Sequence, residues 1–402
     1  MKIASVSFGY PDRKQKNKYI FTHEQAKAFI ENGHDTDVFD LAADSEIARN
    51  SPIDVHEQVR VFRYPKVLKY PSDIFINFRR LKEQKDSISR IVNLEKYDLV
   101  LFSFVDVRYL FYLDSFISGG AAAALTAHGG DAMLGYENIL FRKAKMILLD
   151  KMEYVFAVSD FTGSLVRPYV RNAVKRLIIN YNGINKKKLD YLSDFSREFA
   201  KKKLNLGSKK KMLLTVCNLV KRKGLDIALE ADKILKESYP EFLHIIVGQG
   251  PEKAELAELT AKLGLNDNVR FLDYVEDDGE LAAFFRASDL YVMLSRTIFE
   301  AREAEGFGIV FAEAGYMGVP VVAGNSGGVP SVVKDKVTGY LIDPESESAA
   351  SVAASVCAEL FHNSSLYEEI SGNARKYVQQ NFDWNKNAAR IVAVFEQPAS
   401  GK

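Results

Sequence analysis

The chain has almost no cysteine: Cys217 and Cys357 are the only two among its 402 residues. Two cysteines so far apart form neither a disulfide framework nor a zinc motif, and they fit a reducing compartment. No uncharged apolar stretch reaches about eighteen residues, so the sequence predicts no transmembrane helix. The opening residues MKIASVSFGY lack a basic region followed by a long apolar run, so we expect no signal peptide and a cytoplasmic protein.

An excess of charge of either sign is also missing. Lysine and arginine total 54 and aspartate and glutamate total 53, which leaves a formal net charge of +1. Because duplex binding usually needs a strongly basic domain, we expect no nucleic-acid partner. The length of 402 residues exceeds one ordinary hydrophobic core and suits two or three domains.

Short apolar strands alternate with amphipathic segments along the first half of the sequence. A helix is predicted at residues 23–32, where Gly33 ends it. The alternation predicts an α/β fold, with a parallel sheet that carries helices on both faces. The predicted strands of this half span residues 2–7, 36–39, 99–103, 123–126, 155–158 and 177–180.

The same alternation restarts at residue 211. Two series of this kind predict two Rossmann-like domains, 1–188 and 189–383, with a C-terminal helix in 384–402 that crosses back to the first domain. Parallel sheets bind ligands at the carboxyl ends of their strands, so two facing sheets would form one deep cleft. The second series has predicted strands at 211–216, 244–247, 269–272, 290–293, 319–323 and 339–342, and predicted helices at 224–237, 252–263, 281–287 and 308–316.

The joint between the domains is predicted within residues 185–211, which are charged and poor in strand signals. Its basic residues have two interpretations. They form either a solvated linker and helix surface, or a patch that contacts anionic lipid or a phosphorylated acceptor at the inner face of the cytoplasmic membrane. The basic residues of the joint and its flank are Arg171, Lys175, Arg176, Lys186, Lys187, Lys188, Arg197, Lys201, Lys202, Lys203, Lys209, Lys210 and Lys211, against Asp190, Asp194 and Glu198.

The most informative segment is REAEGFGIVFAE at residues 302–313. Gly306 and Gly308 precede an apolar helix, whose N-terminus offers backbone N–H groups and a positive dipole end to phosphate. Glu305 stands at this entrance and Glu313 lies two turns along, a rise of about 12 Å on nearly the same face. That distance matches a sugar ring, a diphosphate and a ribose, so one carboxylate can bind sugar hydroxyls and the other ribose hydroxyls. Taken alone, the segment also fits a helix start with Glu313 in solvent.

Three further loops follow predicted strands of the same domain. They are LVKRKG at 219–224, GQGP at 248–251 and SGGVP at 326–330. Each is a weak signal alone, since a Gly-x-Gly-Pro turn is usually only a turn. Because all of them lie at carboxyl ends of parallel strands, we expect them to converge on one ligand.

With these loops in place, the chain resembles the GT-B glycosyltransferases of family 4, the group 1 glycosyltransferases. The resemblance covers 212–344 almost throughout, in VCNLVKRKG, VGQGPE, NVRFLDYV, LYVMLS, EGFGIVFAE, GVPVVAG, GGVPSVV and GYLIDP. It is looser in the first half, in NGHDTDVF, TAHGGDA, FAVSDFTGSLV and NYNGIN. The stretch 295–306, longer than usual before the motif, is similar to that of the phosphatidylinositol-mannoside mannosyltransferases.

The resemblance implies two Rossmann-like domains that face each other across a cleft. It implies a retaining transfer of a hexosyl unit from a GDP- or UDP-sugar to a hydroxyl of a glycan, lipid or small-molecule acceptor. The leaving diphosphate itself helps to activate that hydroxyl, and no metal or other cofactor is needed. Two alternatives remain open: a nucleotide-sugar epimerase of the same fold, and a non-catalytic protein that binds nucleotide sugars.

The resemblance also implies roles for single residues. His128 and Glu305 match groups that reach the donor sugar, and Lys223 matches the lysine that neutralises the β-phosphate. These three are the expected catalytic residues. Glu313 matches the glutamate that binds ribose. The expected substrate-binding residues are Asp131, Asn218, Gly248, Gly250, Gly306, Phe307, Gly308, Ile309 and Glu313, of which Gly306 to Gly308 form a backbone cradle.

The chain departs from the family pattern at two places. Asn218 stands where an arginine usually precedes the lysine by five residues, so one cation of the diphosphate clamp is missing. Arg222 or Lys221 can compensate. The loop at residues 9–18 carries no Gly-Gly pair and is basic, so it is suited to an anionic acceptor.

Other polar residues have plainer interpretations. Asp35-Thr36-Asp37 has an Asp-x-Asp form found in metal sites, but it leads into a strand near the chain start, and we expect an exposed strand. His23 is expected to cap or pack a helix. No group of His, Cys, Asp and Glu has metal-ligand spacing, so no metal site is predicted.

Overall fold

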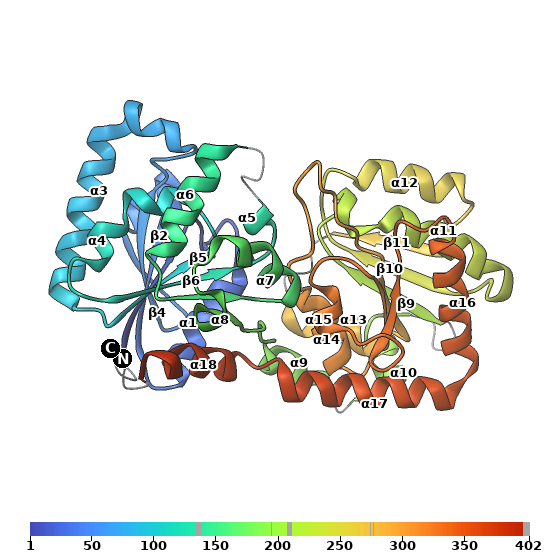
Figure 1. The fold of residues 1–402 in the computed structure, drawn as a ribbon. Helices are drawn as coiled ribbons and strands as arrows, with labels where there is room; N and C mark the ends of the chain where they lie inside the picture. Colours follow the sequence, from blue (N-terminus) through green and yellow to red (C-terminus); the bar gives the residue numbers. More distant parts are fainter. Residues whose placement is uncertain (134–137, 194, 207–210, 274, 276, 397–402) are drawn as a thin grey trace. The chain divides into compact units, whose positions relative to one another are not determined.

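The structure is a computed structural model that describes residues 1–133, 138–193, 195–206, 211–273, 275 and 277–396. The chain forms two compact units, coloured from blue to red along the sequence in Figure 1. Unit 1 contains Met1–Gly183 and the C-terminal segment from Trp384, and unit 2 contains Ile184–Asp383. The second unit therefore begins at Ile184 rather than at residue 189. No helix among the described residues is both long and apolar enough to span a membrane.

Unit 1 is built on an eight-stranded sheet of order β3-β4-β2-β1-β5-β6-β7-β8. Its neighbours pair in parallel except β3 and β4, an antiparallel hairpin that the apolar pattern of the sequence did not predict. The strands are β1 (Lys2–Ser7), β2 (Asp35–Ala43), β3 (Ile53–His56), β4 (Val59–Pro65), β5 (Leu99–Ser103), β6 (Ala122–Ala127), β7 (Tyr154–Ala157) and β8 (Leu177–Ile179).

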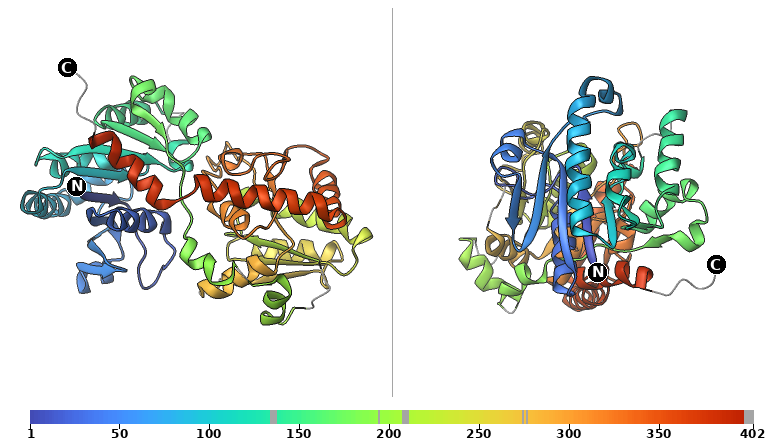
Figure 2. Two further views of the ribbon diagram at one scale, coloured as in Figure 1. Left: turned by 90° about the horizontal axis from the view of Figure 1, so that it is seen from below. Right: turned by 90° about the vertical axis from the view of Figure 1, so that its left-hand side faces the viewer.

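Helices cover both faces of this sheet, as the right-hand view of Figure 2 shows. The long helix α3 (Ile74–Glu95) was not predicted, because polar residues outnumber apolar ones in its sequence. The remaining helices are α1 (Ile20–Glu31), α2 (Ser45–Asn50), η1 (Pro71–Asp73), η2 (Val107–Phe111), α4 (Leu113–Ile117), α5 (Gly130–Met133), α6 (Ile139–Asp150), α7 (Asp160–Val166), η3 (Arg167–Tyr169), α8 (Ala173–Arg176) and α18 (Trp384–Glu396).

Aromatic rings fill the core between the unit 1 sheet and its helices. Phe39 stacks on Phe62 with ring centroids 4.9 Å apart and meets Phe116 edge-on at 5.1 Å. Phe102 also meets Phe116, at 5.8 Å. All four side chains are buried, and burial of each contributes about 2 kcal/mol to folding.

The last helix, α18, packs along α1 in unit 1. The side-chain oxygen of Asn387 accepts a hydrogen bond from Nε2 of Gln25 at 2.9 Å, and its nitrogen donates to the Tyr181 carbonyl at 2.8 Å. A Cβ at Gly183 would lie 2.2 Å from the backbone nitrogen of Trp384. Glycine is therefore needed where the two chain segments that link the units pass each other.

Unit 2 is built on a six-stranded sheet of order β11-β10-β9-β12-β13-β14, with parallel pairing throughout. Its strands are β9 (Met212–Val216), β10 (Leu243–Val247), β11 (Val269–Leu272), β12 (Leu290–Met293), β13 (Val321–Gly324) and β14 (Gly339–Ile342). Its helices are α9 (Lys186–Ser193), α10 (Arg197–Lys203), η4 (Lys221–Lys223), α11 (Leu225–Ser238), α12 (Lys253–Lys262), α13 (Asp278–Ala287), α14 (Ile309–Tyr316), α15 (Val329–Val332), α16 (Ala349–His362) and α17 (Ser364–Asn381).

The predicted joint at 185–211 contains two helices, α9 and α10, whose charges are partly used within unit 2. Lys188 pairs with Asp278 at 3.1 Å. Arg197 and the buried Lys201 both bind Asp289, at 3.1 and 3.0 Å. Cations that hold internal carboxylates are not available to lipid, so the structure favours the helix-surface interpretation of these residues. Asp194, Lys209 and Lys210 lie outside the described residues.

Candidate active site

Loops that follow the strands of unit 2 pack against one another at the carboxyl edge of its sheet. Gly248 follows β10, and a Cβ there would lie 1.8 Å from the carbonyl oxygen of Cys217, which follows β9. Gly250 has the same relationship to Leu219, at 2.2 Å. Any larger residue would collide with these carbonyls, so both glycines hold the loops together.

Backbone hydrogen bonds add two more loops to this group. The N–H of Arg296, after β12, donates to the carbonyl of Arg222 at 2.8 Å. The N–H of Gly328, after β13, donates to the carbonyl of Glu305 at 2.7 Å. The loops that follow β9, β10, β12 and β13 are thus connected, and they contain the predicted site residues of this unit other than Ile309 and Glu313, which lie on α14.

Glu305 and Lys223 form the centre of this group of loops. Nζ of Lys223 lies 2.5 Å from Oε2 of Glu305, and Nη1 of Arg222 lies 3.1 Å from the same oxygen. The side chains of Lys223 and Glu305 are only 9% and 12% exposed. Burial by itself would raise the pKa of Glu305, but the charges of Lys223 and Arg222 outweigh it and hold that pKa below its usual value. The carboxylate is therefore ionised at neutral pH and acts only as a hydrogen-bond acceptor.

Arg222 brings a second cation to this carboxylate, whereas Asn218 is exposed on the loop after β9. Of the two residues that can compensate for Asn218, the structure thus places Arg222 beside Glu305. Lys221 instead lines a separate hollow between α11 and α12.

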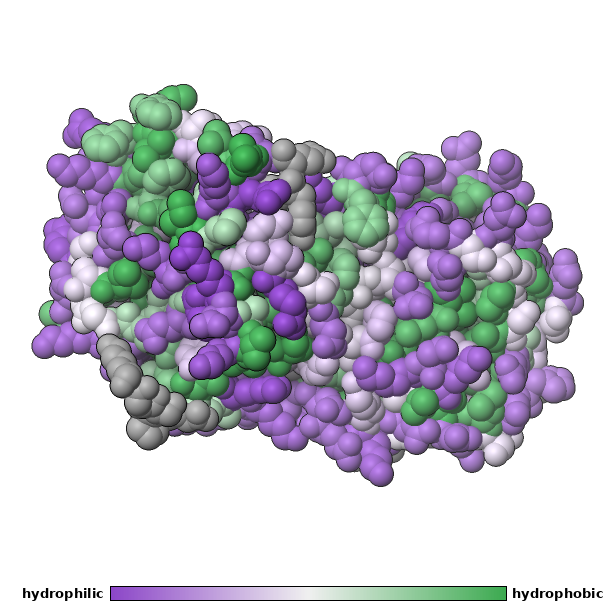
Figure 3. All heavy atoms as spheres, in the orientation of Figure 1, coloured by the Kyte–Doolittle hydropathy of each residue, from purple (hydrophilic) through white to green (hydrophobic). Residues whose placement is uncertain are grey.

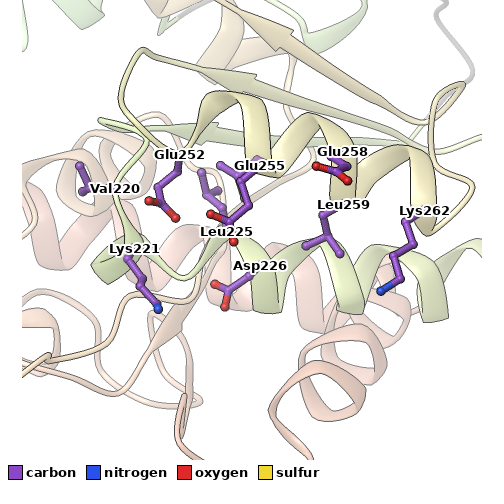
Figure 4. A pocket seen from close by; sticks show the side chains of 10 residues that line it. Val220, Lys221, Leu225, Asp226, Glu252, Glu255, Glu258, Leu259 and Lys262 are labelled. Atoms are coloured by element: carbon purple, nitrogen blue, oxygen red, sulfur yellow. The ribbon is translucent and has the colours of Figure 1, made fainter.

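That hollow, shown in Figure 4, has a volume of about 240 Å³. Its wall carries more acidic than basic side chains, which makes it a poor place for a diphosphate. Asp226 in this wall is already paired with Arg296 at 2.6 Å. The lining residues are Val220, Lys221, Leu225, Asp226, Glu252, Glu255, Leu256, Glu258, Leu259 and Lys262.

The glycine segment before α14, from Gly306 to Gly308, is buried. Gly308 caps the helix with φ of 87°, a left-handed conformation that favours glycine. The ring of Phe307 is buried and packs edge-on against Phe382, with centroids 5.2 Å apart. Because that side chain belongs to the core, the main chain is what Phe307 can offer a ligand. Ile309 and Glu313 are half-buried on α14.

Tyr291 supports the site and was missed by sequence analysis. Its hydroxyl donates to the carbonyl of Val216 at 3.0 Å, and its ring meets Phe311 of α14 edge-on at 5.7 Å. The side chain is fully buried, so it fixes the end of β9 relative to the start of α14. In the sequence, an aromatic residue within an apolar strand cannot be distinguished from an ordinary core residue.

His128 follows β6 in unit 1 and lies among aromatic rings. Its imidazole is 4.4 Å from the ring of Phe21 and 5.0 Å from that of Phe104, centroid to centroid. Within the described residues, its buried Nε2 has no hydrogen-bond partner. Burial lowers the pKa of His128 to about 3, so the ring is neutral at physiological pH. Through Nε2, a neutral imidazole in this position can form one hydrogen bond with a ligand, as donor or acceptor according to its tautomer.

Asp131 holds the loop that carries His128. Its carboxylate accepts from the backbone N–H of His128 at 3.0 Å and from that of Val105 at 2.8 Å. Burial raises the pKa of Asp131 although these hydrogen bonds act in the opposite direction. The predicted substrate-binding aspartate is thus engaged with backbone, which suits a positioning role.

The N-terminal loop is also organised by a buried aspartate. The Asp12 carboxylate accepts from the N–H groups of Lys14 and Gln15, at 2.7 and 2.8 Å. Nζ of Lys14 pairs with Glu46 at 2.8 Å. Part of the basic character of this loop is therefore neutralised within unit 1.

The expectation of an exposed Asp35-Thr36-Asp37 strand is wrong for Asp37. This residue is buried and accepts two hydrogen bonds from Arg60, at 2.7 and 2.6 Å, and one from Tyr97 at 2.5 Å. β4, which the sequence did not predict, brings Arg60 to it. The aspartate is therefore occupied by an ion pair.

One group of metal-ligand type occurs among the described residues, formed by His23, His56 and Glu57 of unit 1. His23 packs in the core, as its position at a helix start suggested, and its Nδ1 lies 2.6 Å from the Tyr10 hydroxyl. Nζ of Lys27 lies 2.6 Å from the Glu57 carboxylate. Because a lysine already neutralises this carboxylate, the group is explained as an ion-pair network beside a buried histidine.

Comparison with known families covers most of the chain. Residues 196–377 match the family described as "Glycosyl transferases group 1", and residues 20–188 match "Glycosyltransferase Family 4". A GDP-mannose-dependent alpha-(1-6)-phosphatidylinositol monomannoside mannosyltransferase of Mycobacterium tuberculosis is 33% identical over 197 residues. That alignment covers 49% of this chain and 50% of the relative, so the chain spans about half the length of this relative.

Three full-length similarities extend over both units. An uncharacterized glycosyltransferase of Methanocaldococcus jannaschii is 25% identical over 413 residues and covers 98% of each chain. The solved structure of Anabaena HepE in complex with UDP has a TM-score of 0.74 at 20% identity, over 99% of this chain and 100% of that one. Sucrose-phosphate synthase from Thermosynechococcus elongatus has a TM-score of 0.75 at 19% identity, over 98% of both chains. The structural matches identify the fold, with its two parallel-sheet α/β domains, as GT-B.

Proposed function

Since this chain belongs to the family 4, group 1 glycosyltransferases of GT-B fold, we propose that it transfers a hexosyl unit from a GDP- or UDP-sugar to an acceptor hydroxyl with retention of configuration. The single observation that carries this function is the pairing of Lys223 and Arg222 with the buried Glu305, at the glycine-rich entrance to α14. Two cations and one carboxylate at a helix N-terminus match the charges of a diphosphate and the hydroxyls of a sugar.

In the donor complex, the cations turn from Glu305 to the diphosphate. Lys223 and Arg222 then neutralise the phosphate charge that grows as the sugar–oxygen bond breaks. The carboxylate of Glu305, released from its ion pairs, accepts hydrogen bonds from sugar hydroxyls. The two cations have an anion beside them in either state, and the Glu305 carboxylate exchanges its ion pairs for hydrogen bonds from the sugar.

Backbone groups supply the rest of the donor site in this proposal. N–H groups of Gly306, Phe307 and Gly308 donate hydrogen bonds to the phosphate oxygens, and Ile309 continues the cradle into α14. Glu313 binds the ribose hydroxyls. No protein nucleophile is assigned, because the leaving diphosphate oxygen can accept the proton of the attacking hydroxyl.

Unit 1 supplies His128 and the acceptor. A neutral imidazole forms a hydrogen bond with the sugar without placing a positive charge beside it, where positive charge develops as the diphosphate departs. Asp131 positions this loop through its backbone hydrogen bonds. One relative is named as a GDP-mannose-dependent enzyme that acts on a phosphatidylinositol mannoside, whereas one similar structure contains UDP. The nucleotide base of the donor and the acceptor are therefore to be identified by experiment.

A donor screen tests this function. Thermal shifts are measured with GDP-, UDP- and ADP-sugars, and turnover is then followed for each binder with the wild type and Glu305→Gln. We expect at least one donor to bind and to be consumed, with turnover lost in the variant. Binding without turnover would indicate a non-catalytic protein, and an altered free sugar without acceptor would indicate an epimerase. If no donor binds, the proposed function is wrong.

A further inference from the structure

Unit 1 exposes large apolar side chains in the first turns of α3 and just before it. Phe75 and Ile76 are 89% and 85% exposed, and Phe78 and Tyr70 are also exposed. The helix kinks at Asn77, whose φ of −109° is not helical, and Figure 1 shows α3 bending at its upper end. Apolar side chains as exposed as these are costly in water, at about 2 kcal/mol each relative to burial.

A second apolar segment lies at the start of α6. Ile139, Leu140 and Phe141 are exposed in succession. α3 and α6 follow the parallel strands β4 and β6, so both helices begin at the carboxyl edge of the sheet, as His128 does. Figures 1 and 2 agree that the two helix starts lie at one end of unit 1, and hydrophobic surface gathers over them in Figure 3.

Exposed cations flank these apolar side chains along the sequence. Lys69 precedes the first segment, Arg79 and Lys82 follow it, and Arg142 and Lys143 follow the second. An apolar surface with basic neighbours is the usual composition of a protein face that binds an anionic bilayer. A protein partner of acidic surface is the alternative occupant, and the experiment below separates the two.

A basic hollow of about 420 Å³ adjoins the first segment. Arg49 of α2, Lys66 after β4 and Arg80 of α3 line it, and none of the three forms an ion pair with a described residue. Glu83 also lines the hollow, but its carboxylate binds Arg79 at 3.0 Å. Three uncompensated cations around one hollow suit a phosphate group.

We propose that unit 1 docks on an anionic phospholipid bilayer. The apolar side chains of the kinked α3 start and the α6 start enter the headgroup layer, and a lipid phosphate enters the hollow formed by Arg49, Lys66 and Arg80. Docking in this way brings the edge of the sheet that carries His128 toward the membrane. It therefore identifies the acceptor as lipid-linked, a consequence that rests on the proposed function.

Vesicle co-sedimentation of the full chain tests the docking. The vesicles are phosphatidylcholine alone or phosphatidylcholine with phosphatidylglycerol, and no donor or acceptor is present. We expect binding to the anionic vesicles and at least about a tenfold weaker affinity for Phe75→Ser/Ile76→Ser, because two apolar anchors are lost. The matched control is Ile53→Ser/Val55→Ser, which removes two exposed apolar side chains from the edge strand β3 and leaves binding unchanged.

The charges are tested separately. The triple variant Arg49→Gln/Lys66→Gln/Arg80→Gln is expected to lose the preference for anionic vesicles, whereas Lys233→Gln/Lys262→Gln/Arg270→Gln, with the same charge change on unit 2, keeps it. Circular dichroism confirms that each variant is folded. If inorganic phosphate binds the wild type but not the triple variant, while anionic vesicles bind neither, the hollow binds a free anion rather than lipid, and the lipid assignment is overturned.

Two further outcomes overturn the docking. Equal binding by the wild type and the Phe75→Ser/Ile76→Ser variant would exclude the apolar segment. Absence of vesicle binding together with self-association that this variant abolishes would make the surface a protein interface. Donor turnover in solution is measured in parallel, so failure of docking and failure of the glycosyltransferase function are distinguished.

Discussion

Nζ of Lys223 lies 2.5 Å from Oε2 of Glu305, and both side chains are almost completely buried. The lysine comes from the short helix η4 after β9, and the glutamate precedes α14, 82 residues later in the chain. In the proposed reaction the two side chains remain paired until the diphosphate of the donor binds the lysine. This relationship makes the pair testable by activity and by stability.

Glu305→Gln is expected to lower kcat/KM by about 100-fold or more, because the charged acceptor for the sugar hydroxyls is lost. The amide keeps the size of the side chain but leaves Lys223 and Arg222 without their counterion. We therefore also expect a lower melting temperature without ligand and a larger rise in melting temperature on addition of nucleoside diphosphate. Calorimetry measures both effects. Wild-type turnover in this variant would contradict the assigned role.

The low pKa of Glu305 predicts a pH dependence of stability. Its folded-state pKa lies below the unfolded value of about 4.3, so the ion pairs stabilise the fold fully above that pH. This contribution is lost as the pH falls through the folded-state pKa. Urea unfolding from pH 3 to 7 should show a steeper loss at the acid end for the wild type than for Glu305→Gln. Parallel curves for the two proteins would refute the prediction.

His128 is expected to stay neutral during catalysis. Its folded-state pKa of about 3 is below the ordinary value of 6.5, so its contribution to stability is complete above 6.5 and declines as the pH falls toward 3. Between pH 7 and 9 the rate should not follow its titration. NMR of the ring protons would show no transition above about pH 5. His128→Phe should lose turnover and His128→Gln should keep part of it, since an amide can still exchange a hydrogen bond.

Arg222 is expected to replace the missing charge at Asn218. Arg222→Gln should weaken donor binding by about tenfold, since one charge-assisted hydrogen bond is lost. Lys221→Gln is the matched control on the neighbouring residue, and it should leave donor affinity nearly unchanged. Isothermal titration with the donor identified by screening measures both variants. Equal losses from the two substitutions would mean that general positive charge, not the position of Arg222, supports the diphosphate.

The backbone of Gly327 packs closely against the backbone of Glu305. A Cβ at this position would lie 2.4 Å from the Glu305 carbonyl oxygen, and φ is 56°. Gly327→Ala should therefore destabilise the fold by more than about 1 kcal/mol and reduce turnover. Gly372→Ala, on α17 where a Cβ meets nothing within 4 Å, should instead stabilise the fold by about 0.5–1 kcal/mol. Denaturant unfolding compares the two variants.

The sequence alone determined the class of fold and the segment that carries the candidate site. Alternating apolar strands and helices are a local property, and Glu305 with its neighbouring glycines forms one short motif. Both can therefore be recognised without the tertiary structure. The hairpin of β3 and β4 and the long helix α3 could not be recognised in this way. The hairpin has exposed apolar residues and the helix is mostly polar, so neither shows the expected alternation of apolar and polar residues.

Only the tertiary structure decided which groups meet. Arg222 and Lys223 reach Glu305 because the loops after β9 and β12 pack through glycines, and a buried Tyr291 joins β9 to α14. It also gave Asp37 a partner in Arg60 and gathered Arg49, Lys66 and Arg80 around one hollow. These are contacts between residues distant in the chain, and they depend on sheet order and side-chain packing, which no local pattern contains.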